Sequence, residues 1–508
     1  MLQISSSASN SLFMTIDIME RSVEALERDL KSVRKYYGSG KTKDASWRES
    51  QLKGLQNFIV EREEEIVRAL KHDLGKHYVE AFRDEVGTLM KTLNLATKSL
   101  KKWMAAKEAK LPQIALLSSA ELVPEPLGLV LIISSWNFPF GLSLEPLIGA
   151  VAAGNTVVLK PSEMSPSCSS LLATVLPTYL DNKAIKVIEG GPEVGELLLQ
   201  QKWDKIFFTG SARVGRIVMS AAAVHLTPVT LELGGKCPAL VDSLSFSWDR
   251  EVAAKRILVA KFGACAGQAC IAIDYILVEK GFSSNLVSLM KVWIKKMFGE
   301  NPKESNTIAR IVNKKQFMRL KNFLTEPKVK ESVVVGGSMH ENDLFIEPTI
   351  LLDPPLDSEI MSEEIFGPVL PIITLDKIED SVEFINSRPK PLAIYAFTKN
   401  QTLQRRLLSE TSSGSLVFND AILQYIADTL PFGGVGECGF GKYHGKFSFD
   451  LFSHHKAVAR RSYFTDFWFR FPPWTLQKLQ LLEVSYNLDY LGILLVILGL
   501  KRSKRSLS

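Results

Sequence analysis

The stretch between Leu127 and Glu232 constrains the fold more than any other part of the chain. Short apolar segments alternate with longer segments that have helix signals, such as Ser165-Pro166 at a start and Gly154-Asn155 at an end. This alternation predicts a parallel, doubly wound sheet of the α/β class. The expected strands are Leu127–Ser135, Thr156–Lys160, Ile185–Glu189, Lys205–Phe208 and Val229–Glu232, with helices at Phe140–Ala153, from Ser165 onward, at Pro192–Gln201 and at Ala212–His225.

The chain on both sides of this stretch is also regular. Residues 20–110 are charged, periodic and almost free of Gly and Pro, which predicts helices at Met19–Tyr37, Ser46–Leu74 and Tyr78–Lys107. A second α/β segment follows to about residue 415. With 508 residues, two large domains that share a cleft are expected. In the second segment we expect helices at Trp248–Phe262 and Phe282–Phe298, and strands near Ala239–Val241, Ile276–Val278, Ser332–Val335 and Leu370–Leu375.

Composition narrows the class of protein. The five cysteines are odd in number and show no paired spacing, so a disulfide framework is not expected, and the histidines and cysteines form no cluster in the sequence that predicts a metal. The N-terminus lacks the pattern of a secretory signal or transit peptide, which favours a reducing, cytoplasmic location. The net charge is +6, and the segment from Lys456 to Ser508 carries all of that excess. A neutral body with a basic tail is not typical of a nucleic-acid-binding protein.

A candidate phosphate-binding turn runs from Phe207 to Gly215, between an expected strand and an expected helix. Gly210 permits close approach of the backbone to a ligand, and the following helix N-terminus favours an anion. The spacing is Gly-x4-Gly and differs from the usual dinucleotide fingerprint. Taken alone, the pattern fits a structural turn equally well.

Three polar residues follow strands or helices at places where chemistry is common. Cys270 ends Gly267-Gln268-Ala269-Cys270, Glu232 ends a strand before two glycines, and Asn137 lies in Trp136-Asn137-Phe138-Pro139. Each has a structural alternative: a lone cysteine is more often a small buried hydrophobe, and the other two fit surface turns.

Together with four further segments, these motifs resemble the aldehyde dehydrogenase superfamily in order and spacing. The last motif is similar to the class 3 branch, which contains enzymes for fatty and medium-chain aldehydes, and the resemblance covers roughly residues 20–475. The matching segments are Trp136–Pro139, Lys160–Glu163, Gly210–Gly215, Glu232–Lys236, Gly267–Cys270, Glu363–Pro368, and Pro431–Gly436 continued by Tyr443–Lys446 and Ser448–Asp450.

The resemblance implies oxidation of an aldehyde to a carboxylic acid by covalent catalysis. Cys270 would attack the carbonyl as a thiolate, and the Asn137 amide and the Cys270 backbone N–H would hold the oxyanion. Hydride transfer to a nicotinamide would leave a thioester, and Glu232 would activate the water that releases the acid.

The resemblance to the aldehyde dehydrogenase superfamily also implies which residues contact the coenzyme. Lys160 and Glu163 would bind the adenosine ribose, and Glu364 and Phe366 would lie at the nicotinamide end. Glu163 disfavours a 2′-phosphate by like charge, which favours NAD, while Arg213 could offset that charge and leaves NADP use open. The residues of the phosphate turn are Gly210, Ser211, Ala212, Arg213, Val214 and Gly215.

The sequence departs from the class 3 pattern at four positions. Cys265 replaces a frequent Asn, Ala266 a polar residue, Cys237 a Ser and Asp428 a frequent His. None is a carried-over catalytic position. Cys265 and Asp428 leave the substrate preference and the redox sensitivity open.

The implied fold has a Rossmann-like cofactor domain, an α/β catalytic domain and small oligomerisation strands, and class 3 resemblance suggests a homodimer. The expected division is a disordered extension at 1–18, a dinucleotide-binding domain at 19–235, a catalytic domain at 236–418, a return to the cofactor domain with the oligomerisation segment at 419–465, and a tail at 466–508.

The tail is rich in aromatic residues up to Trp474, and then has eleven consecutive apolar or glycine residues from Tyr490 to Leu500 before a basic end. A bilayer span needs about 20 apolar residues, so the run is too short to cross. One alternative is a helix packed on the body or on a partner subunit. The other is an interfacial anchor on the cytosolic face of a membrane such as the endoplasmic reticulum, which the basic end favours.

Two rival functions remain. An acylating, coenzyme-A-dependent dehydrogenase would not need Glu232 as a hydrolytic base. A non-catalytic homologue with a binding or structural role would tolerate loss of the nucleophile or the base, yet Cys270, Glu232 and Asn137 are all present.

Overall fold

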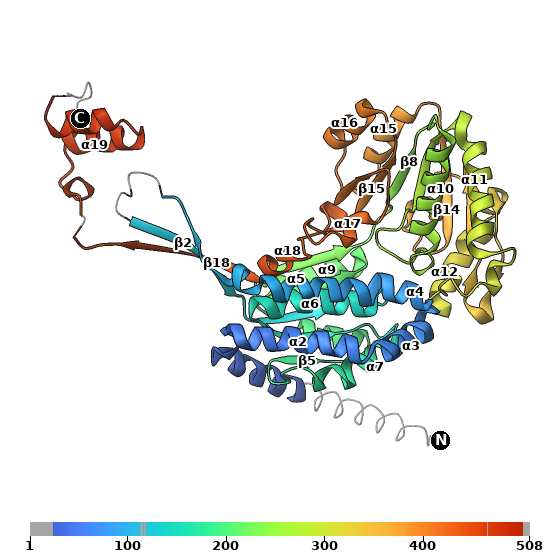
Figure 1. Ribbon diagram of the computed structural model, residues 1–508, viewed down its shortest axis with the longest axis horizontal. Coiled ribbons are helices and arrows are strands. Elements are labelled where there is room, and N and C mark those ends of the chain that lie inside the picture. The colour runs from blue at the N-terminus through green and yellow to red at the C-terminus, as the bar shows by residue number, and fades with distance from the viewer. Residues whose placement is uncertain (1–23, 112–114, 116–117, 465, 501–508) are drawn as a thin grey trace, which may run out of the picture. The chain divides into compact units, whose positions relative to one another are not determined.

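The computed structural model describes residues 24–111, 115, 118–464 and 466–500 (Figure 1). The expected 1–18 extension, the start of the first helix at Met19 and the basic residues after Leu500 lie outside this part of the chain. Packing divides the protein into two compact units. The larger comprises the chain to Leu100 with Pro126–Phe452, and the smaller comprises Lys101–Glu125 with the chain from Ser453.

The first sheet of the larger unit confirms the predicted parallel, doubly wound arrangement. Its strands follow the order β17-β7-β6-β3-β4-β5, all parallel except the short β17 (Gly439–Phe440). The chain proceeds from β3 through β4 to β5 on one side and returns to β6 on the other side of β3. Parallel sheets generally bind ligands at such a reversal of strand order, which lies here at the carboxyl ends of β3 and β6. The bounds are β3 (Leu129–Ile133), β4 (Thr156–Lys160), β5 (Ile185–Val187), β6 (Lys205–Gly210) and β7 (Val229–Leu233).

The crossover helices are also close to prediction. The helix α6 (Pro139–Ala153) begins with Pro at its first position and ends at Gly154, whose φ of +91° is the left-handed conformation that glycine adopts without strain. Every residue of α6 is buried, and it packs against β3 and β4. The others are α7 (Pro166–Thr174), α8 (Pro192–Leu199) and α9 (Ala212–Ala223).

The second sheet of the larger unit has seven strands in the order β10-β13-β14-β9-β8-β15-β16. Sequence patterns predicted β8, β9, β10 and β14 but missed β13, β15 and β16. The helices α10 (Ser247–Phe262) and α11 (Lys280–Phe298) pack against one another, as Figure 1 shows. The strands are β8 (Pro238–Val241), β9 (Tyr275–Glu279), β10 (Val333–Val335), β13 (Thr349–Leu352), β14 (Val369–Leu375), β15 (Ala393–Phe397) and β16 (Ser415–Phe418).

Two of the long N-terminal helices differ from prediction. The prediction of a single helix over Ser46–Leu74 is wrong, because the helix is interrupted at Arg62. The two helices are α2 (Ala45–Glu61) and α3 (Glu63–Leu74). The helix over Tyr78–Lys107 is interrupted by a π-helical turn, η2 (Phe82–Val86), before α5 (Gly87–Met104). Residues 24–38 are helical, in agreement with the first prediction.

The smaller unit contains a three-stranded sheet of β1 (Lys107–Glu108), β2 (Ser118–Pro126) and β18 (Ser453–Arg461). Lys456 and Arg460 of β18 form ion pairs with Glu125 and Glu121 of β2, at 2.7 and 2.5 Å. After it, the tail folds as two helices, α19 (Leu476–Tyr486) and α20 (Tyr490–Ile497), which pack on a small shared core of Leu481, Val484 and Val496.

Candidate active site

The predicted phosphate turn lies at the carboxyl end of β6, at the reversal of strand order. Ser211 caps α9 by accepting a hydrogen bond from the Val214 backbone N–H at 3.4 Å. A Cβ at position 210 would lie 2.6 Å from the Phe208 ring, which would have to shift, and one at 215 would lie 3.1 Å from Leu233, a tight contact. The first turn of α9 leaves backbone N–H groups free for an anion.

The end of β4 supplies the predicted ribose-binding pair. Lys160 Nζ lies 3.1 Å from Glu163 Oε2, with Lys160 buried and Glu163 partly exposed. Thr209 directly precedes Gly210 of the phosphate turn. Its hydroxyl is buried and makes no hydrogen bond. A buried hydroxyl without a partner is rare in proteins, so a polar ligand group would satisfy it. These residues fit a dinucleotide.

The predicted nicotinamide-side residues come from the loop before β14, and the fold carries them to the first sheet. A Cβ at Gly234 would lie 2.2 Å from Glu364 Oε2, so only glycine permits this approach. The Phe366 ring meets the Trp136 ring edge to face at 5.3 Å. Burial, and then the charge of Asp274, raise the pKa of Glu364 to about 8.

The loop that carries Cys270 is held in an unusual backbone conformation. It follows α10, and Cys265, Ala266 and Gly267 all have positive φ, at 48°, 51° and 79°. Gln268 fixes the loop: its amide nitrogen donates to Cys265 O and Arg310 O at 2.9 Å, and its oxygen accepts from Val312 N at 3.1 Å. Strained loops of this kind persist only where the surrounding structure holds them, and they are common at active sites.

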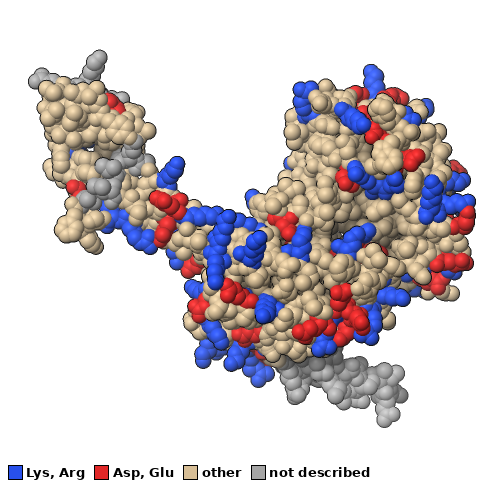
Figure 2. Space-filling model, in the orientation of Figure 1, with Lys and Arg blue, Asp and Glu red and all other residues tan. Residues whose placement is uncertain are grey.

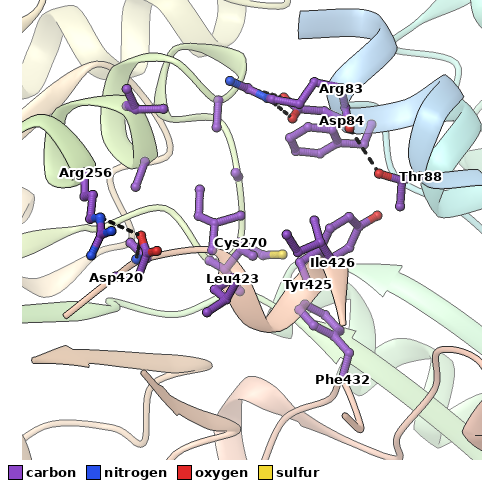
Figure 3. A pocket seen from close by; sticks show the side chains of 18 of the residues that line it. Arg83, Asp84, Thr88, Arg256, Cys270, Asp420, Leu423, Tyr425, Ile426 and Phe432 are labelled. Carbon is purple, nitrogen blue, oxygen red and sulfur yellow. Dashed lines mark hydrogen bonds and ion pairs between the residues drawn. The ribbon is translucent and has the colours of Figure 1, made fainter. Parts of the chain in front are cut away.

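Cys270 is half-buried and lines a cavity of about 430 Å³ (Figure 3). In Figure 3 its sulfur points toward Tyr425 and Ile426. Two partly exposed ion pairs, Arg83–Asp84 and Arg256–Asp420, also belong to the wall. The rest of the wall is mainly apolar: Phe138, Leu142, Val259, Ala260, Ala264, Ala269, Ile271, Ala421, Ile422, Leu423, Tyr425, Ile426 and Phe432, with Thr88 and Lys255.

Glu232 is the next-to-last residue of β7, one residue before the strand ends, and it is buried with both carboxylate oxygens free of hydrogen bonds. Burial raises its pKa well above the usual range. Burial, followed by the charges of Glu364 and Glu232, raises the pKa of Cys270. The ligand-free site therefore holds Cys270 as a neutral thiol, and forming the thiolate requires a base or a nearby positive charge.

Asn137 lies between β3 and α6 and contacts the Cys270 loop directly. Its side-chain nitrogen donates to Gln268 O at 2.9 Å, two residues before Cys270. An amide nitrogen carries two donors, so one N–H remains for a ligand.

A buried ion pair behind Asn137 was not predicted from the sequence. Lys76 Nζ lies 2.7 Å from Glu85 Oε1 and donates to the Asn137 backbone oxygen at 2.9 Å. The other Glu85 oxygen accepts from Phe140 N and Gly141 N, at the start of α6. Burial alone would lower the pKa of Lys76. The charge of Glu85 and of the other acidic groups near Lys76 outweighs burial, so the pKa of Lys76 is raised. This pair fixes the Asn137 turn against the helix N-terminus.

The structure thus brings the three predicted catalytic residues to one place from three distant segments. Two of the four departures from the class 3 pattern, Cys265 and Cys237, are buried and belong to or contact the Cys270 loop. Cys265 is fully buried, does not line the cavity and donates its backbone N–H to Glu80 at 2.6 Å. Cys237 is buried with its sulfur 3.3 Å from Cys270 O.

Comparison with known proteins gives one consistent result. The sequence model of the aldehyde dehydrogenase family matches residues 11–458. Aldehyde dehydrogenase family 3 member F1 of Arabidopsis thaliana is 54% identical over 484 residues, covering 95% of this chain and 100% of the relative.

Solved structures agree. A substrate-bound Staphylococcus aureus AldH superposes with a TM-score of 0.85 at 40% identity, covering 88% of this chain and 96% of the other. An indole-3-acetaldehyde dehydrogenase in complex with NAD+ superposes with a TM-score of 0.79 at 24% identity, covering 87% and 89%. The second comparison shows the fold alone.

Proposed function

This chain belongs to the aldehyde dehydrogenase family, in its family 3 branch, and is an NAD(P)-dependent aldehyde dehydrogenase; we propose that Cys270 is its nucleophile. The observation that carries the proposal is the half-buried Cys270 thiol in an apolar cavity, with a buried, unpaired carboxylate and a side-chain amide beside its loop. A non-catalytic homologue has no need to keep this combination.

The reaction follows from these residues. The Cys270 thiol first loses its proton to solvent water, and the thiolate sulfur attacks the aldehyde carbon to form a thiohemiacetal whose oxygen carries the negative charge. The free Asn137 N–H and the Cys270 backbone N–H stabilise the negative charge on the former carbonyl oxygen. A nicotinamide held by Glu364 and Phe366 would supply the hydride acceptor, and loss of the hydride from that carbon would leave a thioester on Cys270. Glu232 as a carboxylate then takes a proton from water, which attacks the thioester and releases the acid and the thiol.

We propose medium- to long-chain aliphatic or aromatic aldehydes, including those derived from lipids, as substrates. The cavity wall beside Cys270 is mainly apolar. Each methylene buried there contributes about 0.8 kcal/mol, or about fourfold in kcat/KM. The test is NADH formation by the purified protein with straight-chain aldehydes of increasing length. A kcat/KM that falls as the chain grows would contradict this substrate class.

For the coenzyme we propose NAD as the preferred form, with NADP also accepted, bound across the carboxyl ends of the first sheet. The phosphate turn from Gly210 to Gly215 would bind the pyrophosphate, Lys160 and Glu163 the adenosine ribose, and Glu364 and Phe366 the nicotinamide side. Arg213, exposed in the first turn of α9, offers a cation for an additional phosphate. In this assignment the first sheet carries the coenzyme, and the second sheet, from β8 to β16, carries the catalytic loop.

Replacing Glu163 by glutamine should shift the coenzyme preference toward NADP. The substitution removes the negative charge that repels a 2′-phosphate and one ribose contact, so the ratio of kcat/KM for NAD to that for NADP should fall by about tenfold. Steady-state kinetics with both coenzymes measures this ratio. Glu331→Gln, an exposed carboxylate at the end of α13 (Pro327–Glu331), is the control and should leave the ratio unchanged. An unchanged ratio in Glu163→Gln would place Glu163 away from the ribose.

We further propose that the enzyme is a homodimer that uses the three-stranded sheet. Most residues of β18 are exposed. A sheet of three strands is stable in water when one of its faces is covered, and a second copy of the chain would cover it.

Finally, we propose that the tail attaches a cytoplasmic enzyme to the cytosolic face of a membrane such as the endoplasmic reticulum. No helix among the described residues is long and apolar enough to span a bilayer. The tail with its helices α19 and α20 nevertheless presents a mostly uncharged surface (Figure 2). The sequence then continues with the basic residues Lys501, Arg502, Lys504 and Arg505. Its exposed apolar side chains are Trp468, Phe471, Trp474, Tyr486, Leu488, Tyr490, Leu491, Leu494, Ile497, Leu498 and Leu500.

A variant that ends at Pro473 should lose co-sedimentation with anionic vesicles and keep its activity on short, soluble aldehydes. Interfacial helices bind through buried apolar area, and each basic residue adds about 1 kcal/mol on an anionic surface. Leu494→Ser with Ile497→Ser, which alters two exposed side chains of α20 without truncation, should weaken binding in the same direction. If the full chain never binds vesicles and truncation breaks the oligomer, the tail packs on protein instead.

A further inference from the structure

Outside the catalytic loop, the fold gathers three potential metal ligands in the interior of the larger unit. Glu145 lies in α6, Asp428 follows α17 (Leu423–Ile426), and His444 precedes α18 (Lys446–Leu451). One ligand atom from each residue lies within 4.8 Å of the other two. Glu145 is 2% exposed and His444 is 1% exposed. The sequence alone links none of the three, because they come from distant segments.

Three polar atoms of this cluster have no hydrogen-bond partner of normal geometry, although the Tyr425 backbone carbonyl interacts with His444 closely enough to affect its pKa. Glu145 Oε2 and both ring nitrogens of His444 are buried and make no hydrogen bond. Buried polar atoms of this kind are nearly always satisfied by protein, by water or by an ion. Ligands around a metal with bonds of about 2.1 Å are about 3–4.2 Å apart, so three atoms within 4.8 Å of one another could close on an ion by small side-chain rotations.

The remaining groups around the cluster orient the carboxylates. Thr92 Oγ1 donates to Glu145 Oε1 at 3.0 Å and lies 3.4 Å from Asp428 Oδ1. Lys91 Nζ lies 3.0 Å from Asp428 Oδ1, and its side chain is 39% exposed. Burial lowers the pKa of His444 to about 3. The charge of Lys91 lowers it further by a smaller amount, and the Tyr425 carbonyl raises it slightly. The imidazole is therefore neutral at physiological pH, with a ring-nitrogen lone pair available for a metal.

We propose that Glu145, Asp428 and His444 form a binding site for one divalent metal ion of the Mn²⁺ or Zn²⁺ type. One imidazole and two carboxylates suit both ions, and water would complete the coordination. Burial, and then the charge of Asp428, raise the pKa of Glu145 to about 8, so an entering ion would displace a proton from Glu145. With both carboxylates ionised, they and the Lys91 ammonium sum to one negative charge, and a divalent cation and Lys91 compete for Asp428. The Lys91 side chain is partly exposed and also donates to Ile426 O, so an entering ion has to displace its ammonium from Asp428 alone.

The site lies directly behind the wall of the Cys270 cavity. The His444 ring stacks on Phe432 at 5.1 Å and meets Tyr425 edge to face at 4.9 Å, and both of these rings line the cavity. A bound ion would connect α6 with the segments that carry Tyr425 and Phe432. Its expected role is to stabilise that wall, separate from the chemistry at Cys270.

The experiment uses the full chain with Cys270→Ala, which removes the half-buried thiol as a competing ligand and takes activity out of the readout. The protein is dialysed against a chelator and titrated with Mn²⁺, followed by electron paramagnetic resonance, and with Zn²⁺, followed by calorimetry. We expect one ion per chain and a higher melting temperature with the ion. Asp428→Asn should weaken binding by at least about tenfold and abolish the thermal shift.

Two further variants make the test decisive. Lys91→Met leaves the three ligands intact and removes the competing cation, so it should strengthen Mn²⁺ binding by about tenfold. Glu437→Gln, an exposed carboxylate in the same part of the chain, should bind as the parent does. The proposal is overturned if the folded parent binds neither ion stoichiometrically, which would indicate water at the site, or if Asp428→Asn binds as tightly as the parent.

Discussion

Replacing Cys270 by alanine should lower kcat for aldehyde oxidation by about four orders of magnitude or more, because no covalent intermediate can form without the thiol. The measurement is NADH formation at saturating aldehyde and coenzyme. The variant should bind NAD with little change, since the predicted coenzyme contacts come from other segments. Coenzyme binding with lost turnover separates loss of the nucleophile from loss of the fold.

Cys265→Ala is the matched control. Cys265 lies five residues earlier in the same loop, is fully buried and does not line the cavity. The hydrogen bond from its backbone N–H to Glu80 is kept in the alanine variant. Burial raises the pKa of the Cys265 thiol to about 12, so this thiol is not a competing nucleophile. A large part of the activity should therefore remain. Steady-state activity in Cys270→Ala that approaches the wild-type rate would show that Cys270 is not the nucleophile.

The sequence predicted the parallel sheet because most of its strands are buried on both faces. Such strands are continuous apolar runs, as in β4 (Thr156–Lys160), where every residue is buried. The crossover helices have local end signals, such as Pro139 at the start of α6 and Gly154 after it. Helix and strand positions that depend on these local signals were therefore correct to within a few residues.

The support beneath the site could not be predicted in the same way. Lys76 and Glu85 lie in a charged, helical part of the chain, where such residues are normally exposed on the solvent face. Only the tertiary structure shows that both are fully buried and bonded to the Asn137 turn. The break at Arg62 and the π-helical turn at Phe82–Val86 also lack a Gly or Pro that would have marked them.

The proposed catalytic residues were predicted from the resemblance to a known family, and not from local helix or strand signals. Gly234 has to be glycine because Glu364 would otherwise collide with its side chain, and the Cys270 loop needs the positive φ of Gly267. Close packing around a site restricts which residues fit at fixed positions. Because of that restriction, the motifs that resemble the family can be recognised in a single sequence. The substrate wall from Ala421 to Phe432 carries no such restriction, so neither the cavity nor the cluster of Glu145, Asp428 and His444 could be predicted.

Replacing Glu232 by glutamine should separate the two halves of the reaction. The proposed role of Glu232 begins only after hydride transfer, when water must lose a proton to attack the thioester. The first turnover should still release NADH in a burst close to one equivalent per Cys270. The following steady-state rate should fall by about 10²- to 10⁴-fold, which is the usual contribution of a general base. Stopped-flow absorbance of NADH measures both phases.

The pH dependence provides an independent check on the same carboxylate. Burial raises the pKa of Glu232 well above its usual range, so the group holds its proton at low pH and becomes the active base only as the pH rises. Wild-type deacylation should therefore accelerate with increasing pH, whereas Glu232→Gln should lose this rise because glutamine does not titrate. Thr230→Val, a change at a buried hydroxyl two residues earlier in β7, is the control and should keep both the burst and the pH profile. A Glu232→Gln variant that has no burst but an unchanged pH profile would assign Glu232 to the step before hydride transfer and contradict its role as the hydrolytic base.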